Sequence, residues 1–546
     1  MFSLSLLWPL LTAQGDSAAL LRNARRAQAD FEWTRQTRLP MVVARSGRGC
    51  DAQIGRFCYW HDAERDDPPR EPASVGVARN ALIFVLDSVA AALPGDDWIA
   101  GQRVRYLVES DRAPAALAAA RACRGDAWWC EALAGFALHA AGEFVAADSV
   151  YAAALRDMPR DERCRWSDLS ALLDGPLRRL YRLQSCEQRA ALESRLWWLA
   201  QPLHSRPGND RRTEHYARRT MARLLRHAWS PYGAVGGDDV AELIMRYGWP
   251  VAWGQATSSA TATDRTVVGY DREPAYHFLP DAAGASSLTA VRPRERYPSP
   301  YVATFSSLEP QIAAFRRGDS TLVVAAYDVA HDTLFRGRPT AAALVLARGD
   351  GDALVIERRV NAEASGVLAA AAPWPARLAS LEITTAPRAA ARARVALPPG
   401  DSLPRGFALS DLLVFDPSDS LPGDLAAVVP RVRGAATVAR GERIGLYWEV
   451  YGLAPSGEPV AMSVSVVPEK GGWLRRAAES FGIASRGPRM RIEWQEQAMP
   501  RAGFAPRVLV VDVSTLPAGR FRVEVAGRQS GRSPATAVRA FRVVEP

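Results

Sequence analysis

Residues 187–200, Glu-Gln-Arg-Ala-Ala-Leu-Glu-Ser-Arg-Leu-Trp-Trp-Leu-Ala, and residues 207–219, Pro-Gly-Asn-Asp-Arg-Arg-Thr-Glu-His-Tyr-Ala-Arg-Arg, lie where the chain changes character. Apolar residues recur at helical spacing in both segments, and the Pro-Gly pair predicts a turn between two helices. Asn209 or Asp210 can cap the second helix with a side-chain oxygen. The chain before these segments has helical patterns and most of the chain after them has strand patterns. The sequence therefore predicts a multidomain protein, α and then β.

Three arginines of the second predicted helix lie off its apolar stripe. We expect Arg218, Arg219 and Arg223 to face solvent or a partner, because charged side chains rarely leave water without a counterion. After them, the Gly-Gly pair at 236–237 predicts another turn. A short helix is expected over residues 240–246, with Asp238 or Asp239 as its cap.

Several short motifs of this region occur in a fixed order. They are Trp197-Trp198, Pro207-Gly208-Asn209, Glu214-His215-Tyr216 followed by Arg219, and Arg246-Tyr247-Gly248-Trp249-Pro250. This order resembles the bacterial GWxTD domain family over roughly residues 185–255, although Gly236-Gly237-Asp238-Asp239 stands where the name-giving motif would be. The resemblance implies an exported bacterial protein and brings no catalytic mechanism with it.

Composition limits the classes of function. The chain has 546 residues, 48% of them hydrophobic, which is enough for several domains with real cores. The net charge is +9, but Lys470 is the only lysine, and the arginines are mixed with Asp and Glu along the chain. Nucleic-acid-binding proteins concentrate basic residues on one face. We therefore expect no nucleic-acid partner.

The N-terminus is apolar. Residues 1–13 predict a short, atypical signal peptide, because they lack the usual basic residue before the apolar run. The alternative is a buried N-terminal segment. No later run reaches the ~20 apolar residues of a membrane helix, so we expect no transmembrane span. The predicted location is periplasmic or secreted.

The six cysteines lie in neighbouring pairs in the first part of the chain. Even numbers of closely spaced cysteines suit disulfides of an oxidising compartment. A metal site at Cys50, Cys58 and His61 is the alternative, although its spacing matches no standard zinc pattern. Residues 14–74 are expected to form a disulfide-containing segment and a linker. The expected disulfide partners are Cys50 with Cys58, Cys123 with Cys130, and Cys164 with Cys186.

Residues 75–185 predict a helical solenoid resembling tetratricopeptide repeats. Residues 127–161 fit one repeat, with small or aromatic residues at its packing positions and Gly142 at the turn. The same frame recurs at the repeat length of about 34 residues, which places Gly101 in register with Gly135. A generic Ala-rich helical bundle is the alternative. The GWxTD-like helical module then occupies residues 186–255.

The remainder predicts β structure after an irregular connection over residues 256–300. Alternating apolar and polar residues, separated by turn signals, predict two immunoglobulin-like β-sandwich domains, 301–400 and 401–546. Asp-Gly within the sequence Arg348-Gly-Asp-Gly predicts a hairpin. A short helix is expected within residues 473–481.

No catalytic, cofactor-binding or metal-binding motif is recognised, so we assign no catalytic residue, no cofactor and no metal. A polar cluster in the 186–255 module is the best candidate site, although capping and salt bridging explain the same residues. Its members are Asn209, Asp210, Glu214, His215, Arg219, Asp238 and Asp239.

The sequence leaves two functional interpretations. The preferred one is an exported protein-interaction scaffold that binds a protein or peptide on its helical groove. The alternative is a hydrolase with a carboxylate and histidine site at the junction of the 186–255 module and the first β-sandwich. The absence of a recognised nucleophile favours the scaffold, so the protein is expected not to be an enzyme.

Overall fold

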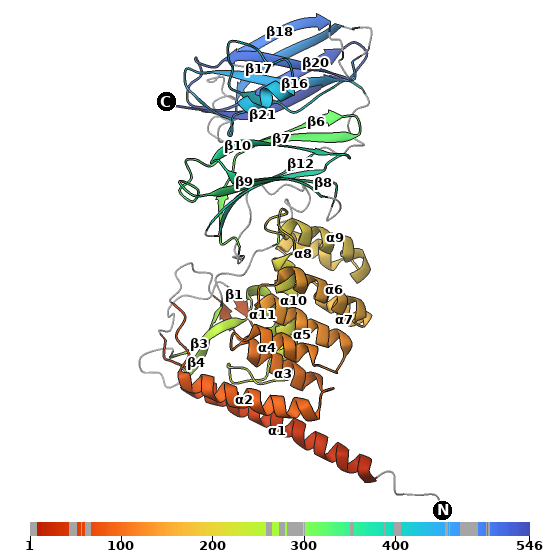
Figure 1. Cartoon of the computed structure of the whole chain (residues 1–546), viewed down its shortest axis with the longest axis vertical. Coiled ribbons are helices and arrows are strands. Elements are labelled where there is room, and N and C mark those ends of the chain that lie inside the picture. The colour runs from red at the N-terminus through yellow and green to blue at the C-terminus, as the bar shows by residue number, and fades with distance from the viewer. Residues whose placement is uncertain are drawn as a thin grey trace, which may run out of the picture. The chain divides into compact units, whose positions relative to one another are not determined.

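The chain folds into two compact units in the computed structural model. The helical unit comprises Met1–Pro202, Arg206–Ala282 and Arg294–Pro300, and the β unit comprises Leu203–Ser205, Ala283–Pro293 and Tyr301–Pro546. The change from α to β structure is therefore confirmed (Figure 1). The structure describes residues 8–42, 52–55, 57–59, 67–257, 265–271, 279–280, 299, 301–349, 354–386, 388–397, 406–453, 457, 459–469, 490–497, 500 and 503–545.

The helical unit is a stack in which each helix from α1 to α6 packs against the next one in sequence. Gly142, with φ of +80°, makes the predicted turn between α5 and α6, a backbone conformation that glycine adopts without a steric penalty. The helices are α1 (Trp8–Arg38), α2 (Ala73–Ala92), α3 (Asp97–Val108), α4 (Ala113–Arg121), α5 (Ala127–Ala140), α6 (Phe144–Asp157), α7 (Arg160–Ser167), α8 (Gly175–Arg182), α9 (Cys186–Ala200), α10 (Asp210–Arg226) and α11 (Asp238–Tyr247).

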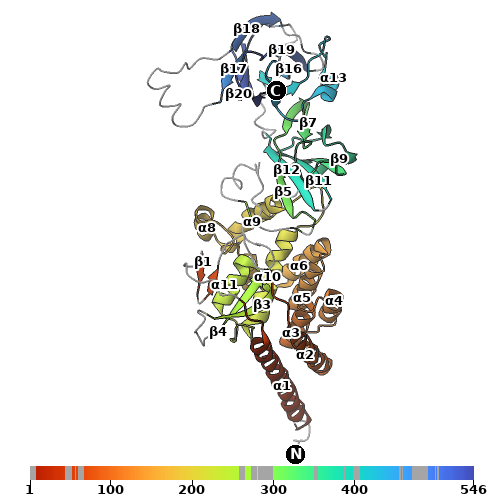
Figure 2. The same cartoon turned by 90° about the vertical axis from the view of Figure 1, so that its left-hand side faces the viewer.

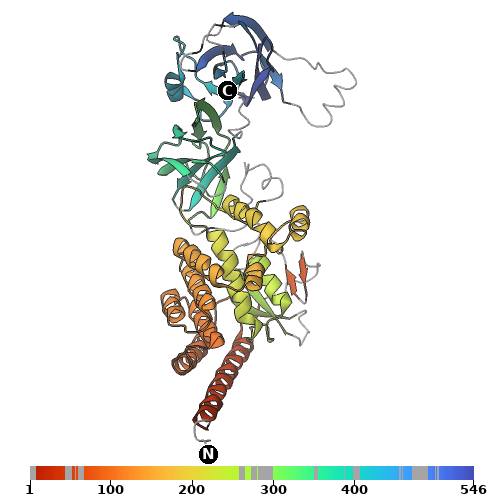
Figure 3. The ribbon, with the colours of Figure 1, turned by 90° about the vertical axis from the view of Figure 1, so that its right-hand side faces the viewer.

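A single helix, α1, spans the predicted signal-peptide boundary at residue 13 and enters the segment predicted to contain disulfides, and the signal peptide itself stays a prediction. One segment differs from the sequence prediction. The region expected to be an irregular connection contains an antiparallel hairpin of β3 (Pro250–Thr257) and β4 (Arg265–Asp271). The prediction failed at the hairpin because Gly254, Gln255 and Gly269 interrupt the apolar pattern of its strands. Another small hairpin, β1 (Ala52–Ile54) with β2 (Phe57–Tyr59), packs on α11 through Ile54 (Figure 3).

Two of the expected disulfides lie in the described part of the chain and are confirmed. Cys123–Cys130 joins the end of α4 to α5, and Cys164–Cys186 joins α7 to α9. Both fit an oxidising compartment. Cys50 and His61, and with them the third disulfide and the alternative metal site, lie outside the described residues.

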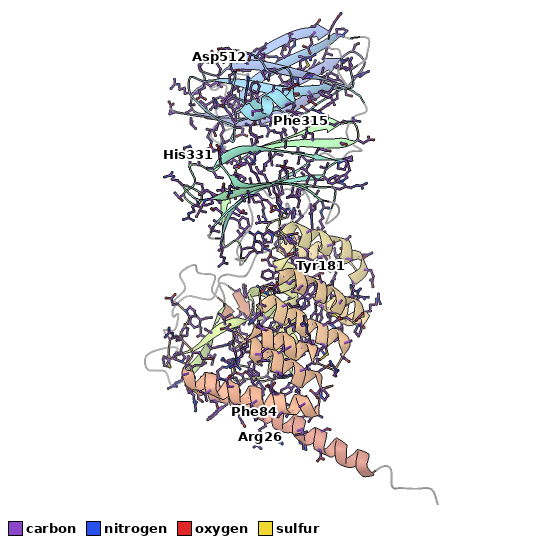
Figure 4. All side chains as sticks on the ribbon, in the orientation of Figure 1. Arg26, Phe84, Tyr181, Phe315, His331 and Asp512 are labelled. Atoms are coloured by element: carbon purple, nitrogen blue, oxygen red, sulfur yellow. A yellow bond between two sulfur atoms is a disulfide. The ribbon has the colours of Figure 1, made fainter. Side chains whose placement is uncertain are left out.

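Among the described helices, α2 passes a length and composition test for a membrane-crossing helix. This differs from the expectation that no run is long enough. Leu82, Leu86 and Val89 of α2 are buried in the core of the helical unit, as in a core helix of a folded domain. Its opposite face exposes Phe84, which is labelled in Figure 4.

The β unit consists of sheets that face one another in pairs. In the first pair, the sheet β10-β7-β6 and the sheet β5-β12-β11-β8-β9 share one apolar core. β8 and β9, which flank the hairpin turn predicted around Arg348-Gly-Asp-Gly, pair antiparallel, and residues 350–353 lie outside the described residues. These strands are β5 (Thr304–Ser307), β6 (Gln311–Arg317), β7 (Ser320–Asp328), β8 (Thr340–Ala347), β9 (Leu354–Ala362), β10 (Ser365–Ala372), β11 (Leu378–Thr385) and β12 (Ala389–Ala396).

In the second pair, β16 with its neighbours β13, β14 and β19 faces the sheet β15-β21-β20-β17-β18. Phe521, Val523 and Val525 of β20 are buried, as the alternation predicted. The helix expected at 473–481 lies outside the described residues. The elements of this pair are β13 (Ala408–Leu409), β14 (Leu413–Phe415), α13 (Leu425–Val428), η3 (Val429–Arg431), β15 (Thr437–Ala439), β16 (Arg443–Tyr451), β17 (Pro459–Pro468), β18 (Met490–Gln497), β19 (Phe504–Asp512), β20 (Gly519–Gln529) and β21 (Ala535–Val544).

The outer face of the sheet that contains β6 and β7 packs against the sheet of the second pair that contains β14 and β16. Phe315 of β6, labelled in Figure 4, lies 5.8 Å from the ring of Tyr447 on β16. Beside it, Arg317 makes a bidentate pair with the buried carboxylate of Glu449, at 2.6 and 2.7 Å. The β unit is thus continuous from one sheet pair to the next.

Candidate functional site

Helix α10 carries most of the predicted polar cluster. Asn209 caps it, with a side-chain oxygen that accepts from the backbone N–H of Arg212 at 3.1 Å, as predicted. Asp210 is the first residue of the helix and is fully buried. A carboxylate at this end of a helix is stabilised by the unpaired N–H groups of the first turn.

Glu214 lies in a buried chain of hydrogen bonds. Its Oε2 lies 2.7 Å from His139 Nε2, and its Oε1 accepts from Arg218 Nε at 2.7 Å. The side chains of His139 and Glu214 are 1% and 4% exposed, and that of Arg218 is fully buried. The expectation that Arg218 faces solvent is therefore wrong. Its guanidinium is kept in the core because a carboxylate and the carbonyl oxygen of Met245, at 3.0 Å, replace water.

The order Thr213, His139, Glu214 resembles a nucleophile, a base and an orienting acid. His139 Nδ1 lies 2.9 Å from Thr213 Oγ1, while that hydroxyl also donates to the carbonyl of Asp210. A hydrolytic nucleophile must be reachable by a substrate, whereas Thr213 is fully buried. The geometry joins α5 to α10 and suits a polar connection inside the core.

His215 points away from Glu214, as expected for adjacent residues of a helix. Its Nε2 donates to the carbonyl of Trp166 at 2.8 Å. Burial lowers the pKa of His215 well below its usual value, and Arg219 lowers it further. The ring therefore stays neutral and connects α10 to α7, and the structure does not make it an acid–base partner of Glu214.

The other members of the cluster do not converge on these residues. Asp238 and Asp239 lie in the first turn of α11, whose cap is Gly237, so the predicted capping role is wrong. Their carboxylates suit the positive end of the helix dipole. Arg219 donates to the backbone carbonyl of Asp168 and lines an open groove. Of the predicted cluster, Arg219 is thus the member that borders such a space.

A second buried polar network, which the sequence interpretation missed, connects α1 to α3. Arg105 of α3 donates to Glu32 of α1 at 2.8 Å and to Glu109 at 2.8 Å, and Arg35 of α1 also pairs with Glu109. Burial raises the pKa of Glu109, but Arg35 and Arg105 lower it more strongly, to about 2. Glu32 and Arg35 lie at helical spacing within α1, but spacing alone does not reveal the bonds to α3, whose partners are 73 and 74 residues away.

Helix α10 itself lies along the inner side of the stack, where it contacts α3, α5 and α6 (Figures 1 and 2). Gln102 of α3 donates to the carbonyl of Leu224 at 2.8 Å. A Cβ at Gly101 would lie 2.6 Å from Leu224, so the glycine permits this close approach. The predicted apolar stripe of α10 is buried as expected: Tyr216, Met221, Leu224 and Leu225.

Among the described residues, no group of three or more His, Cys, Asp or Glu side chains is placed to hold a metal ion. The sequence matches no protein-family model, and a search of curated proteins finds none that is significantly similar.

Proposed function

We propose that the protein is an exported, non-enzymatic scaffold that binds a protein partner through its helical unit. The observation that carries the proposal is the stack of helices with a helix lying along its inner side. Stacked helical repeats present extended surfaces that accept helices and extended peptides. In this chain α10 fills part of that surface, so a partner would bind the surface that α10 leaves uncovered.

The finer assignment of the fold belongs to the same proposal. A tetratricopeptide-like stack is supported by Gly135, where a Cβ would lie 2.9 Å from the ring of Tyr151 on the following helix. Small residues at such positions let paired helices approach, as the 34-residue frame predicts. The facing sheet pairs of the β unit support immunoglobulin-like sandwiches that act as spacers or second contacts.

Export to the periplasm or beyond is supported by the two disulfides and by the resemblance to the GWxTD domain family. A hydrolase that uses Glu214 and His215 is the weaker candidate, because both side chains are buried and hydrogen-bonded within the core.

The test is to immobilise the full chain, capture partners from a periplasmic extract, and repeat the binding with purified components by calorimetry. The scaffold proposal expects a reproducible partner with a defined stoichiometry. Substrate turnover that survives purification and is lost in Glu214→Gln, while the variant stays folded, would instead establish the hydrolase.

A further inference from the structure

A groove of about 360 Å³ opens at the C-terminal half of α10, bordered by the first turns of α3 and α5, by α7 and by α11. Arg219, Arg223 and Arg226 lie on one side of it, at the i, i+4, i+7 spacing that aligns side chains along one face of a helix. Trp98, which is partly exposed, borders the same space, whereas the ring of Trp129 is buried beneath Arg223. The groove therefore combines fixed positive charge with flat apolar surface.

Arg219 is the residue that most needs a ligand. It is mostly buried, and its one hydrogen bond to protein goes to the carbonyl of Asp168. Within the described part of the chain, no group accepts from its Nε, and no carboxylate pairs with it. A guanidinium removed from water without a counter-charge is unfavourable, and an incoming carboxylate relieves that cost.

The carboxylates of the groove are already occupied. Glu162 pairs with Arg165 at 2.7 Å and accepts from the indole N–H of Trp166 at 2.9 Å. Asp97 accepts from the backbone N–H of Asp126 at 3.0 Å. Asp168 accepts from the backbone N–H of Ser170 at 2.8 Å, and Glu162 also lies 3.8 Å from Arg223. Among the described residues, none of these carboxylates forms an ion pair with Arg219. Burial lowers the pKa of Arg219, and the nearby carboxylates of Asp168 and Glu162 offset only part of that effect. They do place negative charge in the lining, which repels a ligand with anionic groups at every position, such as a nucleic acid or a sulfated sugar.

The tryptophan surfaces are held in place by the fold. The indole N–H of Trp98 donates to the carbonyl of His227 at 2.9 Å, and that of Trp129 donates to the carbonyl of Asp97 at 3.1 Å. Arg223 lies over the Trp129 ring at 4.8 Å, and Trp129 is 2% exposed, so of these two rings Trp98 is the one that a ligand can contact. Preorganised aromatic rings bind apolar side chains with little loss of conformational entropy.

We propose that this groove binds an acidic peptide segment of the partner protein, with one carboxylate on Arg219 and a neighbouring apolar or aromatic side chain against Trp98. The proposal rests on the scaffold function proposed above and names the site that recognises the partner. Arginine suits this role because its planar fork can pair with both oxygens of a carboxylate.

The test uses the full chain and fluorescein-labelled synthetic peptides in which a single Glu is flanked by apolar and aromatic residues, together with the same peptides carrying Gln. Fluorescence anisotropy is expected to show that the Glu peptides bind more tightly. Arg219→Gln is expected to weaken the binding of the Glu peptides about tenfold or more, because a hydrogen bond between charged groups is lost. The same substitution is expected to remove the preference for Glu over Gln peptides. Arg226→Gln, on the exposed edge of the groove, is expected to cause a smaller loss without affecting folding. Arg121→Gln, on the exposed surface of α4, is the matched control and is expected to bind as the wild type does.

Equal binding of the Glu peptides by Arg219→Gln, Arg226→Gln and the wild type would contradict the assignment of the groove as the binding site. The same conclusion would follow if the folded chain bound none of the peptides. Tighter, Arg219-dependent binding of a heparin oligosaccharide than of any Glu peptide would overturn the peptide assignment. Capture of a periplasmic partner that is insensitive to Arg219→Gln leaves the scaffold function standing and refutes the groove, whereas the absence of any captured partner refutes the scaffold itself.

Discussion

Replacing Glu214 with glutamine tests whether the best candidate residue is structural. Gln keeps the volume of the side chain and removes the negative charge that lies 2.7 Å from both His139 and Arg218. Loss of one member of a buried ion pair costs about 3–5 kcal/mol, because the remaining charge stays in the core. For a unit of this size, each kcal/mol lost from the free energy of unfolding lowers the melting temperature by about 2–4 °C. We therefore expect a decrease of about 6–20 °C.

Thermal unfolding followed by tryptophan fluorescence is the appropriate assay. Twelve of the 16 tryptophans precede residue 254, so the signal reports mainly on the helical unit. A chain with two units need not unfold in one step, and a local probe avoids assigning the change to the β unit. Glu242→Gln is the matched control, because Glu242 pairs with Arg246 on the same unit and its side chain is 47% exposed. An exposed pair contributes about 0–1 kcal/mol.

Equal melting temperatures for Glu214→Gln and Glu242→Gln would refute the reasoning. In that case burial of the His139–Glu214–Arg218 chain would not contribute to stability, and a functional reason for these residues would have to be sought.

Three further predictions concern other parts of the chain. Replacing both cysteines of the Cys164–Cys186 disulfide should destabilise the helical unit by about 3 kcal/mol in urea unfolding, and replacing those of the Cys123–Cys130 disulfide by about 2, because the first closes the longer loop. The folded pKa of Glu109, about 2, lies below its unfolded value, so its contribution is complete above about pH 5 and is lost as the pH falls toward 2. Glu109→Gln should therefore be less stable than the wild type at neutral pH and should lose less stability on acidification, as measured by urea unfolding at several pH values. Glu449→Gln should cost about 3 kcal/mol by weakening its contact with Arg317, with faster hydrogen exchange in β6 and β16 and no change in the helical unit.

Local sequence rules succeeded where the deciding interaction is local. Asn209 caps α10 because its side chain reaches an N–H three residues ahead, and Gly142 makes its turn because of its own φ. The alternation in β20 identified the buried face of that strand, since one side of a sheet packs on the core. The neighbouring cysteines paired as expected because short loops bring them together.

The errors arose where partners are distant in the sequence. Arg218 lies off the apolar stripe and is therefore predicted to face solvent or a partner. Instead it pairs with Glu214 one turn earlier, and both enter the core because His139 of α5, 75 residues from Glu214, completes the chain of hydrogen bonds. The network of Glu32, Arg35 and Arg105 was missed for the same reason, because it joins residues of α1 and α3 that are distant in the sequence. Charged residues are assigned to the surface by default, and a buried pair can be recognised only when the helices that carry its members are known to meet.

The position of α10 changes how a partner of the helical unit should be sought. A stack of repeats would ordinarily leave its inner side for a ligand, but here Leu224, Tyr216 and Thr220 of the chain's own helix contact α3 and α6. Displacing α10 would also break the buried bonds of Glu214 and His215, so an exchange with a partner helix would carry a large energetic cost. The face of α10 that turns toward the groove carries Arg219, Arg223 and Arg226. Arg223 lies 3.8 Å from Glu162, whereas Arg219 forms no ion pair among the described residues. The same helix thus completes the core on one side and presents arginines on the other, so the proposed recognition of an acidic segment would require no rearrangement of the stack.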